Sequence, residues 1–119
     1  MNRVVGIETE YGCLVSADPL HGPDAWPARV KNYLFKKARA GVIDLHYRDY
    51  EEPPGNGGFL LNGGRLYIDM GHLEYSSPEC RTVEDSVAYD LAGDQLLQSA
   101  LEALGVSEEV AFIKNNVDH

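Results

Sequence analysis

The sequence predicts an α+β fold in which helices cover one face of an antiparallel sheet. Several short segments alternate apolar and polar residues, which is the period of a strand with one buried side. Two longer segments repeat their apolar residues every three or four positions, which is the period of a helix with one buried side. Because each element has a single apolar side, the helices are expected to pack on the apolar face of the sheet and to leave its polar face open.

The composition limits the classes of function. The chain has 119 residues, enough for one domain, and its hydrophobic content of 44% is typical of a folded protein. Its 19 acidic residues outnumber its 10 basic ones, so a nucleic acid is not an expected partner. No apolar run approaches the roughly 18 residues of a membrane span, so no membrane is expected either. Cys13 and Cys80 share no CxxC spacing, which favours a reducing, cytoplasmic location.

The first strand is predicted at residues 3–14, where Glu8 and Glu10 fall on the same face. A helix is expected between Pro27 and Gly41, because proline suits a first turn and glycine suits a helix end. Its apolar side is predicted to consist of Val30, Tyr33, Leu34 and Ala38. Half of the 10 basic residues of the chain lie on the other sides of this helix, which indicates either an ordinary surface helix or a patch for an acidic partner.

The middle of the chain predicts three short strands after a loop rich in proline and glycine, at residues 59–61, 65–69 and 74–79. In the second of them, Arg65, Tyr67 and Asp69 share one face, and the alternate residues are aliphatic. Residues 70–73 are expected to join this strand to the next in a hairpin-like pair that clusters carboxylates at one surface.

The second helix is predicted to begin at Thr82, which resembles the first residue of a capping box with Asp85, and to end at Gly105. Its core side is predicted from the spacing of the large apolar residues, namely Val87, Leu91, Leu97, Leu101 and Leu104. A last strand is predicted at residues 110–115.

The acidic residues of the predicted strands suggest a metal site. Glu8, Asp69 and Glu74 would meet on one face of the sheet, and such oxygen donors suit Mg²⁺ together with phosphate groups. Ordinary solvated surface charge is the alternative. Zinc is disfavoured because the four histidines show no ligand spacing, and the sequence contains no Walker-type glycine-rich loop.

Four motifs occur in the order found in one enzyme family: GIETEYG at residues 6–12, NGGRLYID at 62–69, EYSSPEC at 74–80 and KNNVD at 114–118. Together they resemble the Pup ligase and Pup deamidase/depupylase family, which is related in fold to glutamine synthetase. The resemblance implies a glutamine-synthetase-like sheet. It also implies that residues 1–119 are the N-terminal part of a longer catalytic domain.

The resemblance further implies an activity and a site. Its ligase branch uses ATP and Mg²⁺ to attach the C-terminal glutamate of a prokaryotic ubiquitin-like modifier to lysines of target proteins through an acyl phosphate. By the same resemblance, Asp69 is catalytic, Arg65 and Ser77 contact ATP, and the Mg²⁺ ligands are Glu8, Tyr67 and Glu74.

The branch of the family stays open at this point. The spacing between Asp69 and Glu74 is one residue shorter than in the ligase pattern and favours the deamidase/depupylase, an amide or isopeptide hydrolase. GIETE at residues 6–10 and YLFKK at residues 33–37 look more like the ligase. A non-catalytic fragment is the third possibility.

Overall fold

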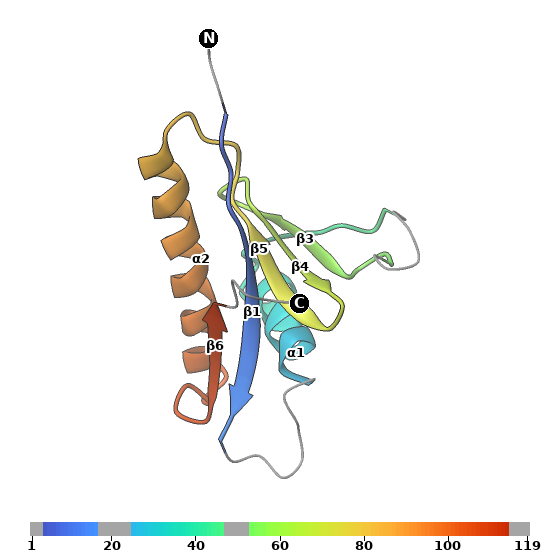
Figure 1. Cartoon of the computed structure of the whole chain (residues 1–119). Helices are drawn as coiled ribbons and strands as arrows, with labels where there is room; N and C mark the ends of the chain where they lie inside the picture. Colours follow the sequence, from blue (N-terminus) through green and yellow to red (C-terminus); the bar gives the residue numbers. More distant parts are fainter. Residues whose placement is uncertain (1–3, 17–24, 47–52, 115–119) are drawn as a thin grey trace.

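Six strands form one antiparallel sheet in the computed structural model, which describes residues 4–16, 25–46 and 53–114. They lie side by side in the order β2-β3-β4-β5-β1-β6 (Figure 1). Along the chain the elements are β1 (Glu8–Val15), α1 (Trp26–Asn32), the π-helical turn η2 (Tyr33–Lys37), β2 (Gly41–Ile43), β3 (Gly57–Leu60), β4 (Arg65–Asp69), β5 (His72–Ser76), α2 (Val83–Ala103) and β6 (Val110–Lys114). The first strand of the chain is thus an interior strand, between β5 and β6.

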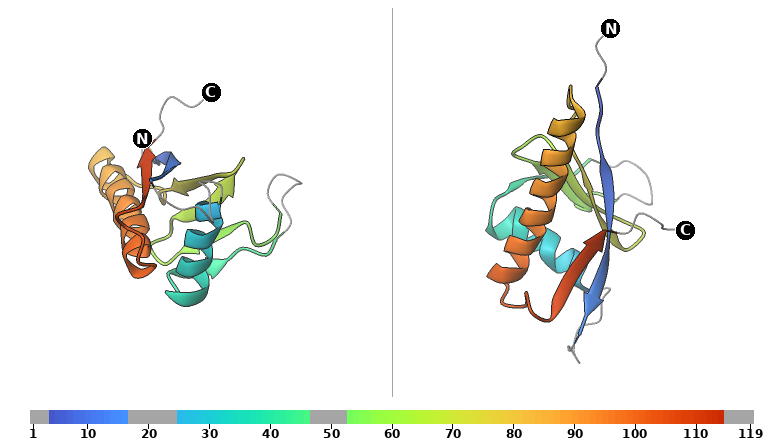
Figure 2. Two further views of the ribbon diagram at one scale, coloured as in Figure 1. Left: turned by 90° about the horizontal axis from the view of Figure 1, so that it is seen from below. Right: turned by 60° about the vertical axis from the view of Figure 1, so that its left-hand side comes forward.

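Both helices lie on one side of the sheet, so the predicted α+β architecture is confirmed (Figure 2). Leu66, Leu73 and Tyr75 of β4 and β5 are fully buried beneath them. The two helices and the remaining strands complete the core with Tyr11, Trp26, Val30, Leu34, Phe35, Leu60, Leu97, Ala100, Leu101 and Val110. Burial of each large side chain contributes about 1.5–3 kcal/mol, so this layer fixes which face of the sheet stays open.

The first helix begins near Pro27, as predicted, and then widens into a π-helical turn. There the N–H of Ala38 donates to the carbonyl oxygen of Tyr33 at 2.9 Å. The wider turn rotates the following residues, so the predicted apolar side is correct only in its first part. Leu34 is buried, but Ala38 is exposed and Phe35 is buried instead.

The β4–β5 hairpin is tighter than the sequence indicates. β4 has the predicted bounds, but β5 begins at His72 instead of residue 74, because Met70 and Gly71 alone form the turn. Their φ angles of 49° and 84° are both positive, as in the two-residue turns whose twist matches that of the flanking strands. Methionine rarely adopts a positive φ, so its presence gave no signal for this turn.

The other strands differ from prediction at their ends. β1 begins at Glu8, not residue 3, and β3 begins at Gly57, not residue 59. β2 is too short to show a period of its own, and pairing with β3 is what defines it. The last residue predicted for β6, Asn115, lies outside the described residues.

The cap of α2 is confirmed, but its predicted core side is partly wrong. Oγ of Thr82 accepts a hydrogen bond from the N–H of Asp85 at 3.1 Å. Leu97 and Leu101 are buried, as predicted. Three other residues of the predicted stripe are 36–53% exposed, namely Val87, Leu91 and Leu104. No helix in the described ranges is long and apolar enough to cross a membrane.

Small residues take the sheet-facing positions of α2 instead. Ser86, Gly93 and Ala100 are buried along the side that meets the sheet. A β-carbon at Gly93 would lie only 2.8 Å from Cδ1 of Tyr75, so glycine permits the close approach of helix and sheet. The predicted core side consists of large apolar residues, whereas this contact requires small ones.

Hydrogen bonds connect α2 to the residues of β1 that point to the helical side of the sheet. The Tyr11 hydroxyl donates to Oδ1 of Asp94 at 2.6 Å, and the Thr9 hydroxyl donates to Asp90. Lys114 of β6 lies 2.5 Å from Asp90 and 3.0 Å from Asp94. Burial and the neighbouring Asp94 raise the pKa of Tyr11, so its phenol stays protonated and keeps donating. These contacts hold β1 in place, and its alternate residues face the open side of the sheet.

Candidate active face of the sheet

The sheet face away from the helices gathers polar side chains in cross-strand rows. Directly paired residues of antiparallel strands point to the same side, and neighbouring strands lie about 4.8 Å apart. The rows are Glu8, Ser76 and Arg65; then Glu10, Glu74 and Tyr67; and then Asp69 with His72. We call this set of residues the acidic face.

The register thus places most of the predicted site residues together. Glu8 and Asp69 lie on the same side of the sheet, as the alternation of the strands predicts. Tyr67 and Glu74 are direct partners in the β4–β5 pair. The chemical role of each residue stays a prediction, because the register concerns only position.

Tyr67 is the one buried residue of the acidic face, at 6% exposed. The guanidinium of Arg65 stacks over its ring, 4.1 Å from the centroid. Its hydroxyl lies 3.5 Å from Oγ of Ser76. Burial, together with the nearby carboxylate of Glu74, raises the pKa of Tyr67 to about 12. Near neutral pH, Tyr67 is therefore an uncharged phenol that can offer an oxygen to a cation.

Glu74 stands beside Tyr67 in an unfavourable setting for a negative charge. Partial burial raises its pKa, and the hydrogen bond from Tyr67 opposes that rise. Repulsion raises the pKa further and comes from three neighbouring carboxylates, those of Asp69, Glu8 and Glu10. A bound cation would relieve this repulsion, because opposite charge favours the ionised carboxylate.

A close contact between His72 and Glu10 is a feature that the sequence did not predict. Nδ1 of His72 lies 2.7 Å from Oε1 of Glu10. The sequence predicts His72 in a turn, where a side chain is normally exposed, but His72 is the first residue of β5. The available signal was the alternation of residues 72–76, which extends the strand two residues before Glu74.

Ser77 follows β5 and uses its hydroxyl locally. Oγ accepts a hydrogen bond from the N–H of Ile7 at 2.9 Å and donates to the carbonyl oxygen of Pro78 at 3.0 Å. The hydroxyl in the row of Arg65 belongs to the preceding residue, Ser76. Contact between Ser77 and ATP, which stays a prediction, would involve a hydroxyl that already binds the backbone.

The acidic face offers the right donors for Mg²⁺ but not a closed set of ligands. Among the described residues, no three Asp, Glu, His or Cys side chains are close enough together to hold a metal ion. Residues two apart on a strand are about 6.8 Å apart, which separates the carboxylates of successive rows. The oxygens of Glu8, Tyr67 and Glu74 nevertheless fit Mg²⁺ in kind, since this ion prefers oxygen ligands and usually keeps several waters.

Comparisons with known proteins show which proteins the chain resembles. The family model described as Pup-ligase protein matches residues 3–119. The Pup--protein ligase of Acidimicrobium ferrooxidans is 34% identical over 126 residues, and that of Xylanimonas cellulosilytica is 37% identical over 124 residues. Each of these alignments covers 98% of this chain but 24% of the relative, so the chain spans about a quarter of their length.

A solved structure has a similar fold. It is the crystal structure of the complex between Prokaryotic Ubiquitin-like Protein Pup and its Ligase PafA, with a TM-score of 0.68 and 28% sequence identity. The match covers 98% of this chain and 22% of the other. The arrangement of strands and helices described above therefore occurs within a much longer protein.

Proposed function

Because the chain belongs to the Pup-ligase protein family, we propose that it supplies the acidic face of a cytoplasmic enzyme that joins a prokaryotic ubiquitin-like modifier to other proteins. The modifier's C-terminal glutamate would form an isopeptide bond with a lysine of a target protein, with ATP as cosubstrate and Mg²⁺ as cofactor. The observation that carries the proposal is the register that puts Glu8, Tyr67 and Glu74 in adjacent rows on one open face.

Glu8, Tyr67 and Glu74 would hold Mg²⁺ in this proposal. When bound, Mg²⁺-ATP supplies phosphoryl transfer to the glutamate side chain, which makes its carbonyl carbon reactive. The repulsion that raises the pKa of Glu74 favours cation binding at this place. Arg65 and Ser77 would contact the nucleotide, and the guanidinium of Arg65 is suited to charge-assisted hydrogen bonds with phosphate.

Asp69 would act on the incoming lysine. A protonated amine has no free electron pair, so it must lose a proton before it can attack the activated glutamate. Asp69 ends β4 next to the tight turn, on the same face as Glu74, and a carboxylate there can accept that proton. General-base assistance of this kind typically contributes about 10²–10⁴-fold to the rate.

The test is conjugation by the full-length protein with ATP, the modifier and a lysine-bearing target. Asp69→Asn should slow conjugation at least about 100-fold, by the same general-base range, while Mg²⁺-ATP binding persists. Asp85→Asn, which makes the same change at an exposed residue on the first turn of α2, should leave the rate unchanged. Conjugates formed at the normal rate by Asp69→Asn would refute the role of Asp69.

A hydrolase of the same fold is the second candidate. The two-residue turn at Met70 and Gly71 accounts for the short spacing between Asp69 and Glu74, which is the observation that favours it. In that enzyme Asp69 would promote attack on an amide or isopeptide carbonyl. Cleavage of a pre-made conjugate without any conjugate synthesis would select this candidate over the ligase. A modifier ending in glutamine would also require a deamidase.

A non-catalytic fragment is the third candidate, since the carboxylates of the described residues do not close around a metal. Titration calorimetry of the 119-residue chain with Mg²⁺-ATP separates this candidate from the others. Weak or absent binding is expected if the remaining length of such proteins completes the site. Tight binding at one nucleotide per chain would show that these residues suffice.

A further inference from the structure

We propose that the groove between the first helix and the end of α2 is a docking site for an acidic segment of another protein. It lies on the helical side of the sheet, away from the acidic face, and does not depend on the proposed reaction. We call it the basic groove. Six residues line it: Arg29, Asn32, Tyr33, Lys36, Lys37 and Leu104.

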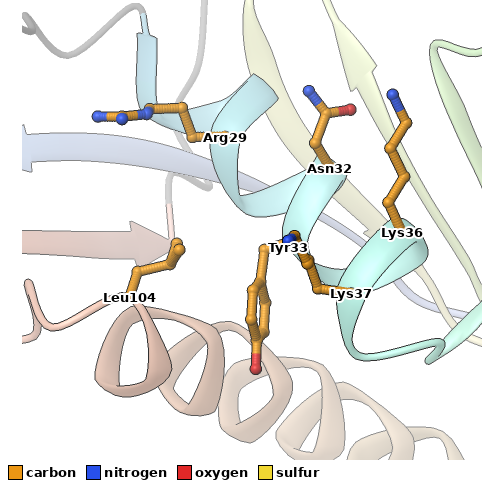
Figure 3. Close-up of a pocket in the computed structure, with 6 residues that line it drawn as sticks. All are labelled: Arg29, Asn32, Tyr33, Lys36, Lys37 and Leu104. Atoms are coloured by element: carbon orange, nitrogen blue, oxygen red, sulfur yellow. The ribbon is translucent and has the colours of Figure 1, made fainter.

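The basic groove combines the large apolar side chains of Tyr33 and Leu104 with cationic side chains of the first helix (Figure 3). Its volume is about 520 Å³. Tyr33 reaches from the first helix toward α2, and Leu104 lies beside it at the end of α2. Leu104 is 36% exposed, although it is a large apolar residue at a junction of two helices. These two side chains could therefore receive an aliphatic side chain from a partner.

Positive charge is concentrated on this helix in a chain whose net charge is −9. Half of the 10 basic residues belong to a single short stretch, namely Arg29, Lys31, Lys36, Lys37 and Arg39. Residues 25–43, which contain that stretch, include neither Asp nor Glu. None of the six residues that line the groove is acidic. The groove is therefore a local positive region that attracts carboxylates.

The π-helical turn η2 supplies part of the lining. It contains Tyr33, Lys36 and Lys37, and its wide winding leaves Leu34 and Phe35 buried while both lysines are exposed. π-helical turns are less favourable than α-helix and often occur at functional sites. The distortion thus coincides with the groove, which is a second and independent feature of the same place.

The charge of the whole chain favours an acidic peptide over a nucleic acid as the occupant. A phosphate backbone carries a charge on every nucleotide and would be repelled by the excess of acidic residues elsewhere on the chain. A short segment with a few glutamates or aspartates experiences less of that repulsion. An aliphatic residue between those acids would fit against Tyr33 and Leu104, the large apolar residues of the groove.

The test uses fluorescence anisotropy to measure how a short labelled peptide of alternating glutamate and leucine binds to the full-length protein. We expect saturable binding that weakens with salt. The same peptide with glutamine in place of glutamate, and a single-stranded oligonucleotide of similar length, should bind at least about tenfold more weakly, which corresponds to about 1.4 kcal/mol. Equal binding of the glutamine peptide, or tighter binding of the oligonucleotide, would overturn the proposal.

Matched variants locate the site. Lys37→Glu should weaken binding about tenfold, whereas Arg39→Glu, an equal charge reversal outside the groove lining, should weaken it less than about threefold. Leu104→Ser should weaken binding, whereas Leu91→Ser, at an exposed leucine of the same helix, should not. Thermal unfolding confirms that each variant is folded. If Lys37→Glu and Arg39→Glu weaken peptide binding equally, the attraction is a diffuse effect of charge and the proposed docking site in the groove is refuted.

Discussion

Replacing Gly93 by alanine should destabilise the protein, although alanine is the better helix former. In the interior of an exposed helix, replacing glycine by alanine stabilises the helix by about 1 kcal/mol. At Gly93 the new β-carbon would lie 2.8 Å from Cδ1 and 3.0 Å from Cγ and Cε1 of Tyr75, well inside normal carbon contact distances. Tyr75 is fully buried in the core, so any shift of its ring would disturb the packing around it. Overpacking of this kind costs about 1–3 kcal/mol, which leaves a net loss of up to about 2 kcal/mol.

Urea unfolding followed by fluorescence measures this effect, because Trp26 is the single tryptophan and is buried in the core. Each kcal/mol lost should also lower Tm by about 4 °C in a domain of this size. Gln95→Ala and Gln95→Gly, at an exposed position of the same helix, measure the local preference for alanine over glycine. If Gly93→Ala is as stable as the parent or more so, the close packing of α2 on Tyr75 is not limiting.

Two further predictions concern the acidic face and the cap of α2. Glu74→Gln should make the protein more stable near neutral pH. A carboxyl whose pKa is raised on folding favours the folded state below its ordinary value of 4.5 and loses that contribution as pH rises through the raised pKa. The advantage of glutamine in urea titrations should therefore shrink as pH falls through the raised pKa toward 4.5 and vanish below it, with Glu108→Gln as an exposed control. An advantage independent of pH would contradict this. Thr82→Ala should lower the free energy of unfolding by about 1 kcal/mol, measured by thermal or urea unfolding, because alanine removes the oxygen that caps α2. Thr82→Ser keeps that oxygen and should leave the free energy of unfolding nearly unchanged.

The sequence was sufficient to predict which side of β1 and of β4 faces the site. Alternation is a local property, so Glu8, Tyr67 and Asp69 could be assigned to faces without knowledge of their neighbours. The same local rule placed β4 correctly. It could not place the start of β5, because Met70 adopts a positive φ that its residue type does not announce. The pair formed by His72 and Glu10 was missed for that reason.

The orientation of α2 was the larger error and has a tertiary cause. Asp90 and Asp94 lie toward the sheet, where hydroxyls of β1 and the ammonium of Lys114 hydrogen-bond to them. A sequence predicts that acidic residues in such positions are exposed to solvent, because their hydrogen-bond partners are distant in the chain. The helix therefore turns Val87 and Leu91 outward, against the apolar pattern. A single sequence contains no local signal for this choice.

The interior place of β1 also has a consequence for how the chain folds. Its neighbours β5 and β6 come late in the sequence, and its hydrogen bonds to Asp90 and Asp94 connect residues 81 and 83 positions apart. Contacts between such distant segments require loop closure before they contribute any stability, which makes them slow to form. During synthesis, Glu8 and Glu10 can take their final positions only after β5, their pairing partner, has emerged. The two acids that β1 adds to the acidic face are thus expected to join it after the local β4–β5 hairpin has formed.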